Sequence, residues 1–272
     1  MTKIDPERAK AFAAALVESG VAQQMLEIVS RAMAAFSTFV SENPQFFANL
    51  SRIVGDIKNW PDWQRKLWAQ AALNGWYVNS HTPITINRPI SAGKATLDAF
   101  MVGHLQRDWT TIATSIVSAV PKRGTVLQCA FDLHVERRYI ASIPLFLAQA
   151  DGVCAEYLGA HLFTDKEQRE ERLAELQASK GGFAAVLLHN LGLQTQFSAG
   201  ISRHSERRKE LAPNRNGILH GSHRHLDYGT KINSLKAFSL LAFVVYALTG
   251  KDRKSTRLNS SHPRLSRMPS SA

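Results

Sequence analysis

The residues best suited to chemistry lie between Arg203 and His225. This stretch of 23 residues holds four of the ten histidines of the chain and six lysines or arginines. A histidine can exchange a proton close to neutral pH, whereas an arginine stays charged and presents a planar fork to phosphate oxygens. The composition therefore favours chemistry at a phosphate group. The basic residues of the stretch are Arg203, His204, Arg207, Arg208, Lys209, Arg215, His220, His223, Arg224 and His225.

A short helix is predicted between Pro213 and Gly221, because proline is favoured in the first turn of a helix and glycine just after its end. On this helix Asn216 and His220 are four residues apart and share one face. Arg215 and His220 are five apart and diverge by roughly 140° around the axis. One helix does not direct both side chains at one atom unless Arg215 reaches around it. We therefore expect a working site to combine two copies of the motif.

These residue types suit the cleavage of a phosphodiester. His220 can act as the proton acceptor or donor, and Arg215 can stabilise a pentacoordinate phosphorane without acting as a base. Asn216 can orient the imidazole or hold a phosphate oxygen. No acidic cluster stands beside them to hold Mg²⁺, so we expect neither a metal nor another cofactor. Metal-free cleavage needs a nucleophile within the substrate, and RNA supplies its 2′-hydroxyl.

The sequence Arg-Asn-x-x-x-His resembles the Arg-x4-His motif of HEPN domains, the helical fold of many toxin, antiphage and RNA-processing ribonucleases. The resemblance extends over residues 213–248, where a polar loop to Tyr228-Gly229-Thr230 leads into an apolar final helix. It is looser over residues 125–158, and residues 1–120 show no specific likeness.

The resemblance implies that Arg215, Asn216 and His220 are the catalytic residues of an endoribonuclease that leaves a 2′,3′-cyclic phosphate. It also implies a homodimer in which the motifs meet at the interface. A role as a toxin or in phage defence would add an inhibitor protein to RNA as an expected partner. A basic patch for substrate binding would consist of His223, Arg224, His225, Arg207 and Arg208.

Several alternatives remain open. Some HEPN domains only bind nucleotides or proteins, so a catalytically inactive binding module is the second hypothesis. Residues 223–225 could form a solvated basic loop as readily as an RNA-backbone patch. His220, His223 and His225 have a spacing that can chelate zinc, but neither a cysteine nor an acidic partner lies close to them in the sequence.

The elements that must position these residues are predicted to be helices throughout, giving an all-α protein with a C-terminal HEPN-like helical bundle. Residues 1–120 are expected to form an N-terminal helical region and residues 121–251 the HEPN-like domain, with Pro121 and Gly124 at the boundary. Residues 125–158 are predicted to form one long helical run kinked at Pro144. The last helix, from about Asn233 to Thr249, is apolar nearly all round and must be buried.

The bulk properties fit an intracellular, cytoplasmic protein. Hydrophobic residues make up 44% of the 272 residues, and no stretch of 18 uncharged apolar residues suggests a membrane span. The two cysteines form no Cys-x-x-Cys pair, and the first residues lack the apolar segment of a secretory signal. Residues 252–272 resemble a translated sequencing adapter, and we expect a disordered, non-native tail. This tail carries +4 of the net charge of +11, which leaves +7 on residues 1–251. That remaining charge is spread too widely along the chain to identify a polyanionic partner.

Overall fold

The computed structural model describes residues 21–42, 45, 62–179 and 183–249. Every regular element in these ranges is a helix, which confirms the predicted all-α fold class. The chain divides into two compact units, Met1–Trp60 and Pro61–Ala272. In the first unit, the helix α2 (Val21–Glu42) agrees with the helical spacing of the apolar residues there. The suspected tail at residues 252–272 lies outside the described residues, so its disorder stays a prediction.

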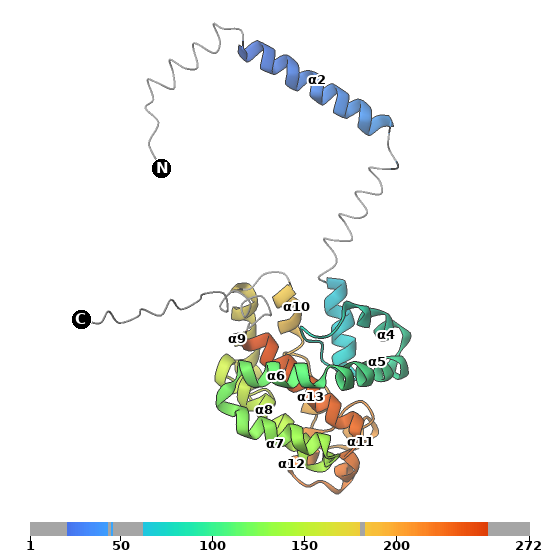
Figure 1. Cartoon of the computed structure of the whole chain (residues 1–272), viewed down its shortest axis with the longest axis vertical. Coiled ribbons are helices and arrows are strands. Elements are labelled where there is room, and N and C mark those ends of the chain that lie inside the picture. Colours follow the sequence, from blue (N-terminus) through green and yellow to red (C-terminus); the bar gives the residue numbers. More distant parts are fainter. Residues whose placement is uncertain (1–20, 43–44, 46–61, 180–182, 250–272) are drawn as a thin grey trace, which may run out of the picture. The chain divides into compact units, whose positions relative to one another are not determined.

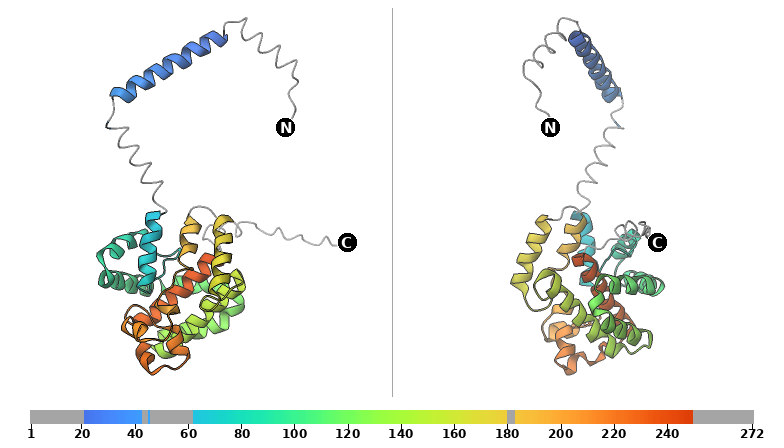
Figure 2. Two further views of the ribbon diagram at one scale, coloured as in Figure 1. Left: turned by 180° about the vertical axis from the view of Figure 1, so that it is seen from behind. Right: turned by 60° about the vertical axis from the view of Figure 1, so that its left-hand side comes forward.

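The second unit begins with a helix at residues 62–73 and an irregular segment. It continues with η1 (Ile84–Ile86), α4 (Asn87–Ala92), α5 (Lys94–Arg107), α6 (Trp109–Ala119), η2 (Pro121–Arg123), α7 (Gly124–Val135) and α8 (Tyr139–Leu158). Then follow α9 (Lys166–Ser179), α10 (Phe183–His189), η3 (Gln196–Ser198), α11 (Arg203–Arg207), α12 (Arg215–Leu219), η4 (His223–Tyr228) and α13 (Lys231–Thr249). The segments that contain the motif, α11, α12 and η4, gather at one end of the unit (Figures 1 and 2).

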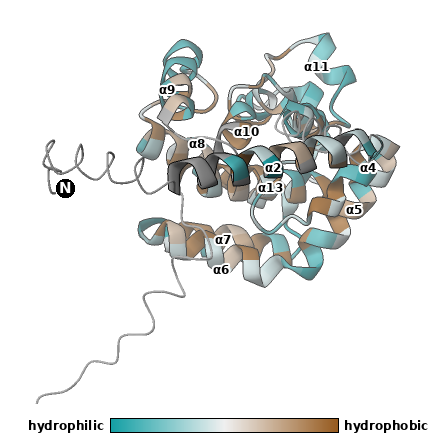
Figure 3. Ribbon diagram, turned by 90° about the horizontal axis from the view of Figure 1, so that it is seen from above, coloured by the Kyte–Doolittle hydropathy of each residue, from teal (hydrophilic) through white to brown (hydrophobic). Residues whose placement is uncertain are grey.

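Helix α13 is the centre of this unit. It packs most extensively on α8 and also contacts α5, α6 and α10 (Figure 1). Among the described helices, α13 has the length and apolar composition to cross a membrane, but 78% of its most apolar window is buried within the fold. That burial is typical of the core helix of a packed domain and agrees with the prediction that this helix must be covered. Among the helices around α13, α9 is coloured as largely hydrophilic (Figure 3).

The division of the chain differs from the one predicted at residues 120 and 121. Residues on both sides of that point belong to one hydrophobic core, which runs from Leu67 to Leu248. Helices α5 and α6, which precede the predicted boundary, pack directly on α13. Pro121 and Gly124 mark only a short connection, because the apolar faces before and after it need each other for burial. The division into compact units falls at residues 60 and 61 instead.

The long helical run predicted for residues 125–158 is two helices that pack against each other, α7 and α8. The break lies at Arg137, which has a left-handed φ of 63°. The Arg137 amide donates to the carbonyl of His134, and the Arg138 amide donates to that of Leu133. No glycine occupies this turn, so no local residue pattern predicted it. Pro144, where a kink was predicted, lies inside α8.

A buried histidine joins α7 to α13. The ring of His134 stacks on Trp109 at 4.3 Å between centroids, and His134 Nδ1 lies 2.7 Å from the hydroxyl of Ser234. That hydroxyl also lies 2.8 Å from the hydroxyl of Ser142 on α8. Burial, with a smaller contribution from the positive charge of Lys231, lowers the pKa of His134 to about 4. The neutral imidazole is therefore part of the packing between helices.

Acid should destabilise the protein through His134. Its pKa is lower in the folded chain than the ordinary 6.5, so the unfolded chain binds the proton first and stability falls as pH drops from 6.5 towards 4. At 1.36 kcal/mol per pKa unit, the loss is about 3 kcal/mol. We expect His134→Asn, which has no titrating group, to lose about that much less free energy of unfolding between pH 7 and pH 4 in urea titrations. Equal losses in the two proteins would refute this role.

Candidate functional site

The helix that contains the motif, α12, begins at Arg215 because Asn214 caps it. Asn214 Oδ1 accepts a hydrogen bond of 2.6 Å from the amide of Gly217, and Asn214 Nδ2 donates to the carbonyl of Ala199 at 2.9 Å. Such a cap satisfies one of the backbone amides that the first turn of a helix leaves without an intrahelical partner. The second bond fixes the start of α12 to the loop that follows η3.

The other end of α12 is closed by Gly221, as the sequence predicted. Gly221 has a left-handed φ of 62°, a conformation that glycine adopts without steric cost. Its amide donates to the carbonyl of Ile218, and the amide of Ser222 donates to that of Gly217. This pair of bonds is a Schellman motif. The helix has five residues, so its ends rather than its length hold it in place.

Arg215 is half-buried and held on two sides. Its Nη1 donates to Asn216 Oδ1 at 3.0 Å, and its guanidinium carbon lies 5.4 Å from the ring centroid of Phe163. Asn216 Nδ2 in turn donates to the carbonyl of Ala199 at 3.1 Å. In the structure, Asn216 therefore orients the arginine rather than the imidazole of His220. The guanidinium keeps further N–H groups for a phosphate.

His220 lies at the C-terminal end of α12 with its side chain exposed. No hydrogen bond or ion pair joins it to Arg215 in the described part of the chain. Their separation follows from the helix geometry of about 100° per residue, which places them on different sides of α12. The motif within one protomer thus presents a fixed cation and an accessible imidazole in different directions.

The predicted substrate-binding residues fall into two groups. His223 and Arg207 are exposed, and Arg224 and Arg208 are partly exposed. Arg224 Nε lies 3.8 Å from a carboxylate oxygen of Glu206, which connects η4 to α11. These four basic residues therefore belong to neighbouring surface segments.

His225 does not belong to that exposed patch. It is only 3% exposed, and its imidazole lies against the backbone of Gly217. Glycine is required there because a Cβ on residue 217 would be 2.3 Å from His225 Cδ2. The expectation of a basic loop that exposes all three residues of 223–225 is therefore wrong for His225, because the missing side chain of Gly217 lets the ring pack inward.

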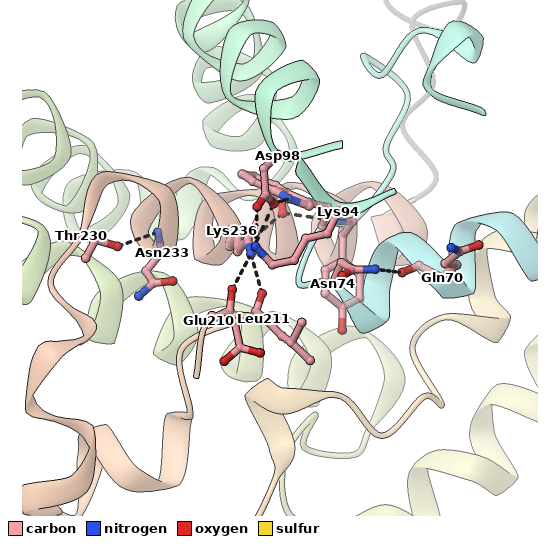
Figure 4. Close-up of polar contacts among 12 residues, drawn as sticks. Gln70, Asn74, Lys94, Asp98, Glu210, Leu211, Thr230, Asn233 and Lys236 are labelled. Carbon is pink, nitrogen blue, oxygen red and sulfur yellow. Dashed lines mark hydrogen bonds and ion pairs between the residues drawn. The ribbon is translucent and has the colours of Figure 1, made fainter. Parts of the chain in front are cut away.

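A buried lysine positions the segment that leads into α12. Lys236 of α13 is fully buried, and its Nζ donates to the carbonyls of Leu211 at 2.5 Å and Glu210 at 3.4 Å (Figure 4). The ammonium also lies 3.6 Å from Asp98 Oδ1 and 5.3 Å from the ring centroid of Trp76. Burial lowers the pKa of Lys236 to about 8, and the negative charge of Asp98 opposes this shift. The charge thus binds α5, α13 and residues 210–211 together.

The network leaves no room for a side chain at Gly75. This residue has a left-handed φ of 84°, and a Cβ on it would lie 2.5 Å from the carbonyl oxygen of Leu211 and 3.0 Å from Lys236 Cδ. The contacts of Gly75 and Lys236 were not predicted from the sequence. The available signal was a charged residue in a helix that is otherwise apolar all round, because a buried lysine needs partners.

Pro144 frees a backbone carbonyl of α8, which accepts a hydrogen bond from the loop after α12. A proline has no backbone N–H, so within α8 it leaves the carbonyl of Ile140 without its helical donor. The hydroxyl of Tyr228 donates to this carbonyl at 3.1 Å. Gly229 follows with close backbone packing, since a Cβ there would be 2.3 Å from Ile140 Cγ1. The end of η4 is therefore fixed to the first turns of α8.

The described part of the chain contains no group of three or more His, Cys, Asp or Glu side chains placed to hold a metal ion. The three histidines whose spacing could chelate zinc do not converge, since His220 and His223 are exposed whereas His225 is buried. Comparisons of the chain with protein-family models, with curated proteins and with solved structures found no match.

The packing of His225 on Gly217 can be tested by adding a methyl group. Alanine normally stabilises a helix by about 0.5–1 kcal/mol relative to glycine. We expect Gly217→Ala to destabilise the protein by about 1–3 kcal/mol instead, because the new Cβ overlaps the imidazole. Gly103→Ala is the matched control, since a Cβ there meets nothing within 4 Å inside α5. Urea unfolding of both variants measures the difference, and a Gly217→Ala protein at least as stable as the wild type would refute the contact.

The hydrogen bond between Tyr228 and Ile140 should depend on Pro144. We expect Tyr228→Phe to lower the free energy of unfolding by about 1 kcal/mol. In a Pro144→Ala background the loss should be smaller, because the new amide can donate to the Ile140 carbonyl. A double-mutant cycle measured by urea unfolding tests this, with Tyr157→Phe on the exposed side of α8 as a neutral control. The same loss in both backgrounds would contradict the explanation.

Proposed function

We propose that this protein is a metal-independent endoribonuclease of the HEPN type that acts as a homodimer. The observation that carries the proposal is the short helix α12, which holds Arg215 in a fixed orientation and leaves His220 accessible. Support also comes from the all-α fold, in which the motif precedes an apolar core helix. These features fit the resemblance of residues 213–248 to HEPN domains.

The proposed reaction uses only groups of the protein and the RNA. The 2′-oxygen attacks the adjacent phosphorus while the bond from phosphorus to the 5′-oxygen breaks. An imidazole of His220 takes the proton of the 2′-hydroxyl, and an imidazolium or water returns a proton to the leaving oxygen. Arg215 stabilises the additional negative charge of the pentacoordinate phosphorane, oriented by Asn216. The products are a 2′,3′-cyclic phosphate and a free 5′-hydroxyl.

A second copy of the chain would complete the site. Arg215 and His220 face different directions in one protomer, so a dimer could bring the arginine of one copy to the histidine of the other. Apolar side chains support such a contact because Leu219 beside His220, Leu226 in η4 and Ile140 at the start of α8 are all exposed. A symmetric dimer would cover these residues and form two sites.

The remaining parts of the proposal concern partners and setting. The exposed Arg207 and His223 and the partly exposed Arg208 and Arg224 would bind the RNA backbone, a contact that weakens with added salt. The place of action would be the cytoplasm. We further propose a role in a toxin system or in phage defence, and with it an inhibitor protein as a partner.

The proposal predicts RNA cleavage that continues in EDTA. His220→Ala and Arg215→Ala should each reduce the cleavage rate of a labelled RNA by at least about a hundredfold, since each removes a group that acts in the transition state. His189→Ala and Arg172→Ala remove exposed residues of the same types on α10 and α9 and should leave the rate unchanged. Mass spectrometry of the products should show the cyclic phosphate.

Mixing the two inactive variants tests the shared site. Half of randomly formed dimers contain one copy of each variant and have one intact site out of two, so roughly a quarter of the wild-type activity should return. Cleavage that survives in both single variants would discard the assignment. RNA or nucleotide binding with no cleavage by the wild type would favour the alternative, an inactive nucleotide- or protein-binding module.

A further inference from the structure

The aromatic ring that holds Arg215 lies outside α12, in the loop of residues 159–165 between α8 and α9. The guanidinium carbon of Arg215 is 5.4 Å from the ring centroid of Phe163, and an aromatic face attracts a cation without neutralising it. Asn216 belongs to the same short helix as Arg215, so it fixes the guanidinium only relative to α12. Among the described residues, no other group outside α12 forms a hydrogen bond, ion pair or ring contact with this guanidinium. The position of the charge relative to the core therefore depends on the 159–165 loop.

A single carboxylate on α8 fixes the backbone of this loop at Phe163. Asp151 Oδ1 accepts hydrogen bonds from the amides of Leu162 at 2.8 Å and Phe163 at 3.2 Å, and Asp151 Oδ2 lies 3.3 Å from His161 Nδ1. The Asp151 side chain is only 15% exposed, so water competes little for these bonds. Hydrogen bonds to an ionised acceptor are also stronger than those between neutral groups. Asp151 thus holds in place a loop that has no regular secondary structure of its own.

Two further side chains hold the same loop. The buried Arg169, in the first turn of α9, donates from Nη1 to the carbonyls of Leu162 at 2.6 Å and His161 at 3.4 Å. Asp165 Oδ2 accepts a hydrogen bond of 3.0 Å from the amide of His161. Leu162 is buried in the core, whereas Phe163 packs against the core and stays partly exposed. The backbone on both sides of the Phe163 ring is therefore fixed before any substrate binds.

This arrangement orients Arg215 without cancelling its charge. A carboxylate in direct contact with the guanidinium would also fix it, but the ion pair would offset the positive charge that a phosphorane requires. Here the oxygens of Asp151 bind the loop, and the connection from Asp151 to Arg215 passes through the neutral ring of Phe163. The guanidinium therefore keeps its charge and most of its N–H groups for the substrate.

We propose that Asp151 is a positioning residue for Arg215 and that it acts through the backbone and the ring of Phe163. The inference rests on the proposed function in assigning Arg215 to the transition state. It identifies two residues outside the Arg-Asn-x-x-x-His sequence, Asp151 and Phe163, on which the cleavage rate depends although neither touches the RNA.

Cleavage kinetics of full-length variants test this role. Phe163→Leu should lower kcat about tenfold and leave KM nearly unchanged, because the guanidinium acts on the transition state rather than on bound RNA. Phe163→Trp keeps an aromatic face and should retain most of the rate. Asp151→Ala should lower kcat to a similar extent as Phe163→Leu. Asp151→Asn keeps an oxygen acceptor for the two amides and should lose less.

Two matched controls and a second background separate positioning from a general structural effect. Phe100→Leu changes another partly buried phenylalanine, and Asp108→Ala removes another carboxylate paired with a histidine; both should leave kcat unchanged. In an Arg215→Ala background, Phe163→Leu and Asp151→Ala should lower the remaining rate no further, because the group that they position is absent. Circular dichroism at the assay temperature checks that each variant is folded. Further loss in that background, or wild-type kcat in the folded Phe163→Leu protein, would overturn the inference.

A spectroscopic measurement tests the contact without cleavage. The ring current of Phe163 should shift the guanidinium N–H signals of Arg215 upfield in the NMR spectrum, and their loss in Arg215→Ala assigns them. Phe163→Leu should remove the shift, Asp151→Ala should reduce it, and Phe100→Leu should leave it unchanged. Identical Arg215 signals in the wild type and the folded Phe163→Leu protein would refute the positioning.

The two proposals can fail separately. RNA cleavage that requires Arg215 but is insensitive to Phe163→Leu and Asp151→Ala would refute the positioning and keep the nuclease. Arg215 signals that depend on Phe163 and Asp151, with no cleavage by the wild type, would refute the nuclease and support the positioning of Arg215 within a binding module.

Discussion

A buried ammonium ion inside an apolar helix imposes the main constraint on this fold. Lys236 cannot reach water, so its charge must be satisfied by Asp98 and by the carbonyls of residues 210–211. These partners belong to α5 and to the chain just before Asn214, far from each other in sequence. Removing any one of them would leave a buried charge with incomplete compensation. The requirement therefore fixes the point from which α12 starts.

From that point onward, polar contacts and close backbone packing hold the motif in place. A helix of five residues has little stability of its own, so α12 depends on the Asn214 cap, the contact of Gly217 with His225, and the bond from Tyr228 to the α8 carbonyl freed by Pro144. Gly217 and Pro144 thus create places where neighbouring segments can approach the backbone closely. Ile218 and Tyr228 of this segment also pack against the hydrophobic core, while the charged side chains of Arg207 and His223 remain accessible at the surface.

The parts of the fold that could be predicted from sequence are those set by neighbours in the chain. The glycine end of α12 and the buried character of α13 both follow from local patterns. The turn at Arg137, the burial of His225 and the pairing of Lys236 depend on residues distant in sequence, and no local pattern shows such contacts. The divergence of Arg215 and His220 stays a prediction from helix geometry.

The different surroundings of Arg215 and His220 suit the different tasks proposed for them. A guanidinium stays charged at any relevant pH, so fixing it in advance against Asn216 and Phe163 costs none of its function and reduces the reorganisation needed when charge develops on phosphate. An imidazole that must accept and release protons has to reach both its substrate and water, which an exposed position at the end of a helix permits. Burial of His220 beside the arginine would favour the neutral ring and hinder its protonation. Separation within a protomer therefore preserves the chemistry of each group until the substrate, and in our proposal a second copy, brings them together.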